Sequence, residues 1–141
     1  MNENQKAYLR ALRLLSIKAR FQNELECRLK QEKFSDQAIA YALEQCANYF
    51  NDEELGKTRM RSKAKKGFGA KYLKANLRRY LSDEEAEDAL EEFDERAVLE
   101  AYLEKHPKLL MDPQGKARLL RRGFDLQSIN EVFAKYRLPI L

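Results

Sequence analysis

The sequence predicts an all-α protein, and three observations favour this fold class. Leu (21) and Ala (16), which favour helices, far outnumber the β-branched residues Ile (4) and Val (2), which favour strands. Gly (5) and Pro (3) are too scarce for the frequent turns of an all-β fold. A Ser or Asp residue also recurs with apolar residues four and eight positions after it, which is the pattern of capped amphipathic helices.

The composition limits the compartment and the class of protein. A chain of 141 residues with 44% hydrophobic residues can bury a core, although 35% of its residues are charged and its mean hydropathy is −0.72. No apolar run approaches the roughly 20 residues that span a membrane, and the start MNENQKAYLRAL lacks the apolar segment of a signal peptide. We therefore expect a cytoplasmic protein with no membrane partner, in which Cys27 and Cys46 are reduced thiols.

Three windows, 24–43, 72–90 and 115–133, share one pattern. In each window a Ser or Asp is followed by apolar residues four and eight positions later: Ser35/Ile39/Leu43, Ser82/Ala86/Leu90 and Asp125/Ile129/Phe133. Recurrence of the same caps and apolar sites at the spacing of these three windows is typical of stacked helical units. A single globule is the other possibility, but the repeat favours three tandem three-helix repeats at 1–50, 51–94 and 95–141, arranged as an elongated row that can curve.

Each expected helix has a start or stop signal or an apolar stripe. Ser35 and Asp125 are expected N-caps, Asn51 and Ser82 begin capping boxes, and Asp112-Pro113 sets a cap followed by Pro at the first helical position. Gly67 and Gly123 are expected C-cap residues, and Phe34, Leu81 and Phe124 precede three of the caps as hydrophobic staples. The expected helices are 5–16, 21–32, 36–49, 52–66, 70–79, 83–93, 95–105, 113–122 and 126–136.

The segment 57–80, KTRMRSKAKKGFGAKYLKANLRRY, contains ten cations and no acidic residue. These candidate binding residues are Lys57, Arg59, Arg61, Lys63, Lys65, Lys66, Lys71, Lys74, Arg78 and Arg79. On helix 52–66 they form two stripes beside the apolar line Gly56/Met60/Ala64, although like charges at i, i+4 repel. The turn 67–69 then leads into helix 70–79, so the cationic faces of both helices are expected to converge on one surface.

Two interpretations of this basic segment remain open. The residues 83–104 carry eleven acids and one base, so the acidic helix 83–93 offers internal neutralisation, and the last lysines complement the helix dipole. A polyphosphate or acidic partner would instead reward two successive helices without an acid, because phosphate contacts release counterions. Since exposed helices usually alternate signs, we favour a binding surface. Stacking of Phe68, Tyr72 or Tyr80 on bases is the weaker idea, because aromatic residues at helical spacing usually pack in the core.

The sequence contains no catalytic, metal or cofactor constellation. His106 is the single histidine and lacks Cys or acid partners, Cys27 and Cys46 lack ligand spacing, and Gly67-Phe68-Gly69 is too short for a phosphate loop. Cys46 is expected in the core and Cys27 at the surface. A helix-turn-helix reader is disfavoured, because the third helix of each repeat is not basic. We expect a non-catalytic binding protein without a metal, a cofactor or a small-molecule substrate.

The middle of the chain resembles the RecX family of bacterial regulatory proteins. The resemblance rests on Tyr49-Phe50-Asn51-Asp52 and on the segment 61–69, RSKAKKGFG, and it extends to Glu24-Leu25 and to the segment 116–124, KARLLRRGF. It covers roughly residues 8 to 136, and two positions depart from the family pattern. Phe21 stands where the family has a capping Ser, and Leu55-Gly56 stands where it has an aromatic-Ala pair.

The resemblance implies three tandem three-helix repeats and a function. Proteins of this family bind the RecA recombinase and its nucleoprotein filament, have affinity for single- or double-stranded DNA without sequence preference, and restrain filament growth, ATP hydrolysis and strand exchange. We therefore expect a regulator, mainly an inhibitor, of RecA in DNA repair, homologous recombination and the SOS response. The alternatives are a sequence-nonspecific nucleic-acid-binding protein or a helical-repeat adaptor with another partner.

Overall fold

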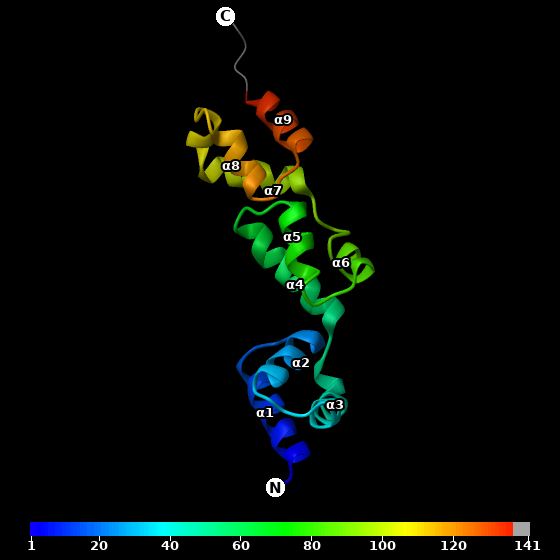
Figure 1. The fold of residues 1–141 in the computed structure, drawn as a ribbon. Helices are drawn as coiled ribbons and strands as arrows, with labels where there is room; N and C mark the ends of the chain where they lie inside the picture. The colour runs from blue at the N-terminus through cyan, green and yellow to red at the C-terminus, as the bar shows by residue number, and fades with distance from the viewer. Residues whose placement is uncertain (137–141) are drawn as a thin grey trace, which may run out of the picture.

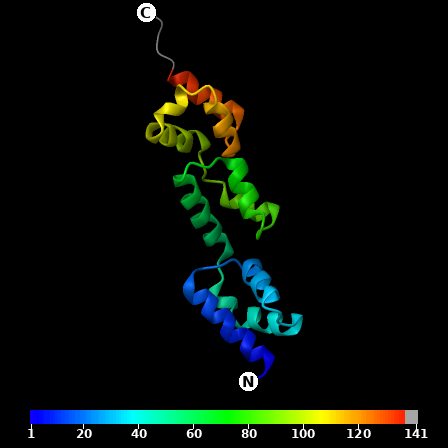
Figure 2. The ribbon, with the colours of Figure 1, turned by 60° about the vertical axis from the view of Figure 1, so that its left-hand side comes forward.

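The computed structural model describes residues 1–136 as three successive groups of helices in a row. Figures 1 and 2 show the N-terminus at one end of the row and the last helix at the other. The first group is α1 (Glu3–Ile17), α2 (Gln22–Gln31), α3 (Asp36–Gln45) and the 3-10 turn η1 (Ala47–Tyr49). The second is α4 (Asp52–Lys65), α5 (Ala70–Leu77) and α6 (Asp83–Ala89). The third is α7 (Glu95–Lys105), η2 (Pro107–Leu110), α8 (Gly115–Arg121) and α9 (Leu126–Lys135).

The predicted all-α class is confirmed, and residues 1–136 contain no strand. The first group, α1 to α3, has a core of small and aliphatic residues: Ala7, Ala11, Leu14, Leu25, Leu29, Ala38, Ile39, Ala42 and Cys46. Alanines on both α1 and α3 let these helices approach closely. Cys46 is buried and Cys27 exposed, as predicted, and burial raises the pKa of the Cys46 thiol.

The second and third groups each have a core of their own. The second contains Leu77, Leu81, Ala86 and Ala89, and it also takes in Phe21 from the first group. The third contains Leu99, Leu103, Leu119, Phe124, Ile129 and Val132. Because Phe21 lies ahead of α2 but is buried among residues that follow it by more than 50 positions, the first two groups share a packed contact.

Several predicted caps are confirmed. The side chains of Ser35, Asn51 and Ser82 each accept a hydrogen bond from a backbone N–H in the first turn of the next helix. Gly67 and Gly123 follow their helices with φ of +84° and +90°, a conformation that glycine adopts without strain. These residues end α4 and α8 and turn the chain toward the next helix.

One predicted cap and several predicted boundaries are wrong. Helix α8 begins at Gly115 and not at Pro113, because Asp112 Oδ1 accepts from the Gln114 N–H at 2.8 Å and holds this segment in a turn. Asp125 makes no side-chain cap; the Glu95 carboxylate lies at this helix start and accepts hydrogen bonds from the Asp125 N–H and the Ser128 hydroxyl. Helices α3 and α6 end early, at Gln45 and Ala89, where the chain continues as a 3-10 turn and a tight turn.

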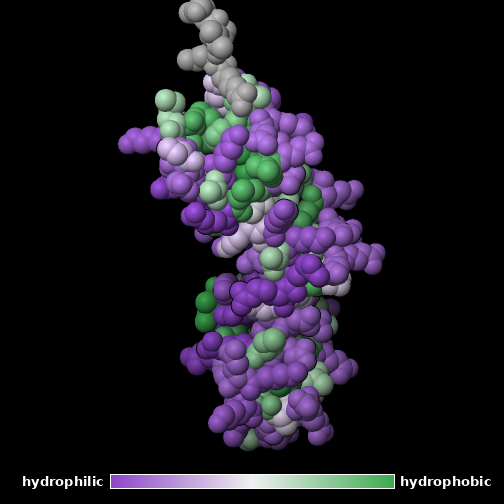
Figure 3. Space-filling view, turned by 45° about the horizontal axis from the view of Figure 1, so that its top comes forward, coloured by the Kyte–Doolittle hydropathy of each residue, from purple (hydrophilic) through white to green (hydrophobic). Residues whose placement is uncertain are grey.

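The face shown in the space-filling view is predominantly hydrophilic (Figure 3). Hydrophobic patches lie near the C-terminal end of the row, which α7 to α9 form. No helix within residues 1–136 combines the length and the apolar character needed to cross a bilayer.

Candidate binding surface

Five of the ten predicted binding residues form ion pairs within the chain. Lys57 lies 3.7 Å from Glu53, Arg59 2.6 Å from Glu24, Arg61 3.6 Å from Glu92, Lys74 3.1 Å from Glu87, and Arg78 2.5 Å from Asp83. Three of these partners belong to α6 or to the short turn after it, so the acidic segment neutralises part of the basic segment. Most of the pairs are solvent-exposed, and such pairs stabilise a fold only slightly.

The other five predicted residues, Lys63, Lys65, Lys66, Lys71 and Arg79, have no carboxylate within 4.0 Å among residues 1–136. Lys63 Nζ lies 5.8 Å from the centre of the Phe68 ring, and the Arg79 guanidinium lies 5.5 Å from that of Tyr80. Lys65, Lys66, Lys71 and Arg79 are exposed. We call all five residues, Lys63 included, the unpaired cations, because no carboxylate in the described part of the chain neutralises their charge.

Helices α4 and α5 bring part of the predicted set together in a groove of about 330 Å³. Arg59 and Lys63 of α4 line this groove with Arg79, which follows α5. Ser62, Asn76 and Tyr80 complete it with hydrogen-bonding groups, and Glu24 contributes one carboxylate. Lys65 and Lys66 instead line a different groove, between α4 and α7. The predicted cations therefore face more than one surface.

The aromatic residues of the basic segment are engaged within the fold. Phe68 stacks on Tyr72 with ring centres 4.0 Å apart, and the Arg122 guanidinium lies 4.3 Å from the Phe68 centre. Tyr80 stacks on Phe21 at 5.9 Å. The structure thus favours the packing interpretation of these rings over base stacking.

The junction between the first two groups depends on Phe21, the residue at the position of the expected Ser cap. Phe21 is 1% exposed, and the Arg59 guanidinium lies 4.5 Å from its ring centre. Arg59 also donates to Glu24 Oε1 at 2.6 Å, and Glu24 accepts in turn from the Phe21 N–H at 3.3 Å. The lost cap is thereby replaced by a cluster that joins α2 to α4.

Arg122 forms the junction between the second and third groups. Its Nε donates to Gly67 O at 2.7 Å and its Nη2 donates to Lys66 O at 2.5 Å. The guanidinium lies near both the Phe68 and the Tyr102 rings, 4.3 Å and 4.7 Å from their centres. Backbone bonds extend the junction, from Gly69 N–H to Arg122 O at 2.9 Å and from Lys71 N–H to Gly123 O at 3.2 Å. The segment 66–69, KGFG, is thus a junction motif.

Two features of the third group were not predicted from sequence. Glu95 accepts from Ala70 N–H at 2.9 Å and from Ser128 Oγ at 2.8 Å, so it joins α5 to α9. A groove of about 820 Å³ between the end of α7 and α8 is lined by the cationic residues Lys105, Lys108, Arg118, Arg121 and Arg122. The dense cations of the segment 116–124 were a signal for this groove, although they are separated in sequence from the longer run.

Within residues 1–136 no group of three or more His, Cys, Asp or Glu side chains is placed to hold a metal ion. An elongated row of three-helix groups, with cations gathered in open grooves, defines the class of helical-repeat proteins.

Comparisons with known proteins identify the family. A family model for the first three-helix domain of RecX matches residues 7–46. The chain is 33% identical over 140 residues to the regulatory protein RecX of Prosthecochloris aestuarii (strain DSM 271 / SK 413), covering 92% of this chain and 93% of that protein. It is 30% identical over 139 residues to the regulatory protein RecX of Chlorobium phaeobacteroides (strain BS1), covering 92% of each chain. The chain belongs to the RecX family of non-catalytic regulatory proteins, as the sequence resemblance indicated.

Solved structures support the fold. A crystal structure of RecX from Lactobacillus salivarius superposes with a TM-score of 0.80 at 23% identity, covering 94% of this chain and 96% of that one. A second crystal structure of a regulatory protein RecX gives a TM-score of 0.78 at 19% identity, covering 92% of this chain and 71% of that one. The all-α fold of three-helix repeats is therefore shared with these proteins.

Proposed function

We propose that this protein regulates the RecA recombinase in the cytoplasm by binding the RecA nucleoprotein filament, including its DNA. It acts mainly as an inhibitor that restrains filament growth, ATP hydrolysis and strand exchange. Membership of the RecX family implies RecA as the partner. The elongated row of helix groups supports this function, because one molecule then reaches across more than one subunit of a filament.

The observation that carries the proposal is the set of unpaired cations on the second helix group. Carboxylates of the chain pair with five of the ten basic residues of 57–80, and Lys63, Lys65, Lys66, Lys71 and Arg79 are the members free to contact a polyanion. Contacts of this kind are made to the backbone of single- or double-stranded DNA and carry no sequence preference.

The test is the DNA-dependent ATPase of RecA, measured with this protein added below stoichiometry to RecA. We expect inhibition at substoichiometric amounts, because one bound molecule blocks further growth of a filament of many subunits. An unchanged ATPase, with the protein shown to be folded by circular dichroism, would contradict the proposal.

A second candidate is sequence-nonspecific nucleic-acid binding with a partner other than RecA. The cationic groove between α7 and α8 favours it, because Lys105, Lys108 and Arg121 also lack a carboxylate within 4.0 Å in the described part of the chain. The RecA ATPase distinguishes the two candidates. The second candidate predicts salt-sensitive binding to bare DNA and no effect of the protein on RecA.

A further inference from the structure

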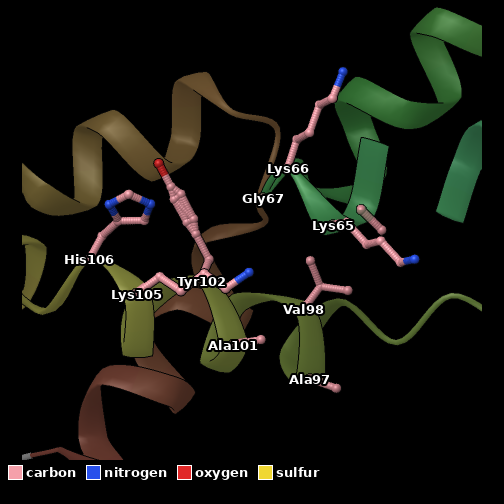
Figure 4. Close-up of a pocket in the computed structure, with 10 residues that line it drawn as sticks. Lys65, Lys66, Gly67, Ala97, Val98, Ala101, Tyr102, Lys105 and His106 are labelled. Atoms are coloured by element: carbon pink, nitrogen blue, oxygen red, sulfur yellow. The ribbon is translucent and has the colours of Figure 1, made fainter. Parts of the chain in front are cut away.

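The groove between α4 and α7 has an apolar floor, unlike the groove that holds Lys63 and Arg79. Its volume is about 390 Å³, within the range of roughly 300–1,000 Å³ in which proteins bind ligands. Its floor is formed by Ala64 at the end of α4 and by Ala97, Val98, Ala101 and Tyr102 of α7. Figure 4 shows these α7 side chains beside the end of α4 and the Gly67 turn.

The rim of this groove is cationic. Lys65 and Lys66 close it on the α4 side, and Lys105 with His106 closes it at the end of α7. In Figure 4 the amino group of Lys66 is directed away from the Tyr102 ring, so that the charge lies at the edge and not on the floor. None of the three lysines has a carboxylate within 4.0 Å among residues 1–136.

The floor is unsuited to nucleic acid. Stacking of a base requires an open aromatic face, but the Tyr102 ring is already in contact with three groups. Its centre lies 4.7 Å from the Arg122 guanidinium and 4.4 Å from the His106 ring. The third group is Gly67, which lies so close to the ring that an added Cβ would be 2.4 Å from Tyr102 Cδ1. The remaining floor is methyl and isopropyl groups, which provide no donor for a phosphate.

We propose that this groove docks an acidic peptide segment of a partner protein through one aliphatic or aromatic anchor side chain. The anchor lies on Ala97, Val98 and Ala101, where it buries apolar surface, and flanking Asp or Glu side chains pair with Lys65, Lys66 and Lys105. An apolar floor inside a cationic rim selects for both features together. The inference does not require RecA to be the partner; it shares Lys65 and Lys66 with the proposed function and adds the apolar floor, which that function does not use.

The test compares two fluorescein-labelled synthetic peptides by fluorescence anisotropy. One consists of Asp and Glu residues around a central Leu-Leu pair, and the other has Ser-Ser at the same place. We expect the full-length protein to bind the Leu peptide about tenfold tighter or more, because burial of a Leu side chain favours binding and the two peptides carry equal charge.

Variants of the floor and the rim locate the binding. Ala97→Gln with Ala101→Gln fills the floor without changing charge, and both alanines are exposed on a helix, where Gln is well tolerated. This variant should lose the preference for the Leu peptide, whereas Lys105→Gln should weaken both peptides. The matched control is Ala40→Gln with Ala134→Gln, exposed on α3 and α9, which should retain the tenfold preference.

Equal affinity for the two peptides would overturn the proposal, as would a Leu preference that survives the floor variant. Binding of a DNA duplex by the same variants distinguishes a peptide groove from a nucleic-acid surface. If the floor variant weakened duplex binding as much as it weakened the Leu peptide, the groove would be a nucleic-acid surface and the proposal would be wrong.

Discussion

Arg59 Nη2 donates to Glu24 Oε1 at 2.6 Å, and this ion pair joins the second helix group to the first. The side chains of Arg59 and Glu24 are 25% and 14% exposed, which makes this pair the least accessible of the ion pairs in the described residues. A cation near the start of the basic segment thus joins two helix groups, whereas Lys66, at the end of the same helix, has no carboxylate within 4.0 Å among residues 1–136.

Replacement of Arg59 should therefore affect stability. Arg59→Met removes the charge-assisted hydrogen bond and the contact with the Phe21 ring, and we expect the free energy of unfolding to fall by about 1–3 kcal/mol. Lys66→Met, at an exposed position without an ion pair, should change it by less than about 0.5 kcal/mol. Urea denaturation followed by circular dichroism measures both, and equal stability of the two variants would refute this role of Arg59.

Glu95 should be required for the second junction. Glu95→Ala leaves the Ala70 N–H and the Ser128 hydroxyl, both only partly exposed, without their acceptor, so the free energy of unfolding should fall by about 1–3 kcal/mol. Glu91→Ala, in the exposed turn before α7, is the control and should be close to neutral. Hydrogen exchange should show faster exchange at the start of α5 in the Glu95 variant, and unchanged protection there would count against this role.

Gly123 should be intolerant of a side chain. Its φ is +90°, and a Cβ would lie 2.5 Å from the Tyr72 backbone nitrogen, so neither the conformation nor the space admits alanine. We expect Gly123→Ala to destabilise by about 2–4 kcal/mol, from left-handed strain and from displacement of α5. Thermal unfolding measures this loss, and a melting temperature equal to that of the wild type would show that the close approach of the helices is absent.

The stability of the first group should depend on pH through Glu32. Hydrogen bonds from Arg10 and then from Arg28 hold the pKa of the Glu32 carboxyl below its ordinary value. Since the folded pKa is lower than the unfolded one, the contribution to stability is present above the unfolded pKa and is lost as pH falls through the folded pKa.

Glu32→Gln should accordingly be less stable than the wild type at neutral pH, and this difference should disappear in acid, once Glu32 is protonated in both states. Urea denaturation at neutral and at acid pH tests the prediction. A stability difference that is the same at both would assign the effect to lost packing and not to charge.

Local signals in the sequence predicted much of the fold. Ser35, Ser82, Gly67 and Gly123 act within a few residues of their own helix ends, and so their roles can be read from short windows. The contacts that join the helix groups cannot be read in this way. Arg59 meets Glu24 across 35 residues and Arg122 meets Gly67 across 55 residues, and nothing near either arginine in sequence identifies its partner.

The same limit applies to the candidate binding surface. The sequence located the cations of 57–80, but it did not show which of them the acidic segment neutralises. That outcome depends on how α6 and the turn after it pack beside α4 and α5, which bring Glu87 to Lys74 and Glu92 to Arg61. Only the folded chain separates the paired cations from the unpaired ones.

Binding of the RecA–DNA filament by charge-reversal variants tests the proposed surface most directly. Fluorescence anisotropy of the labelled protein with preformed filaments gives the affinity, and circular dichroism verifies helicity. Lys65→Glu with Lys66→Glu should weaken binding by about tenfold or more, since two cations near phosphate or acidic groups become repulsive. Lys6→Glu with Arg13→Glu, exposed on α1, makes the same change in net charge and should bind nearly as the wild type does. Unchanged affinity of the Lys65 and Lys66 variant, with helicity intact, would contradict the assignment of these cations to the partner surface.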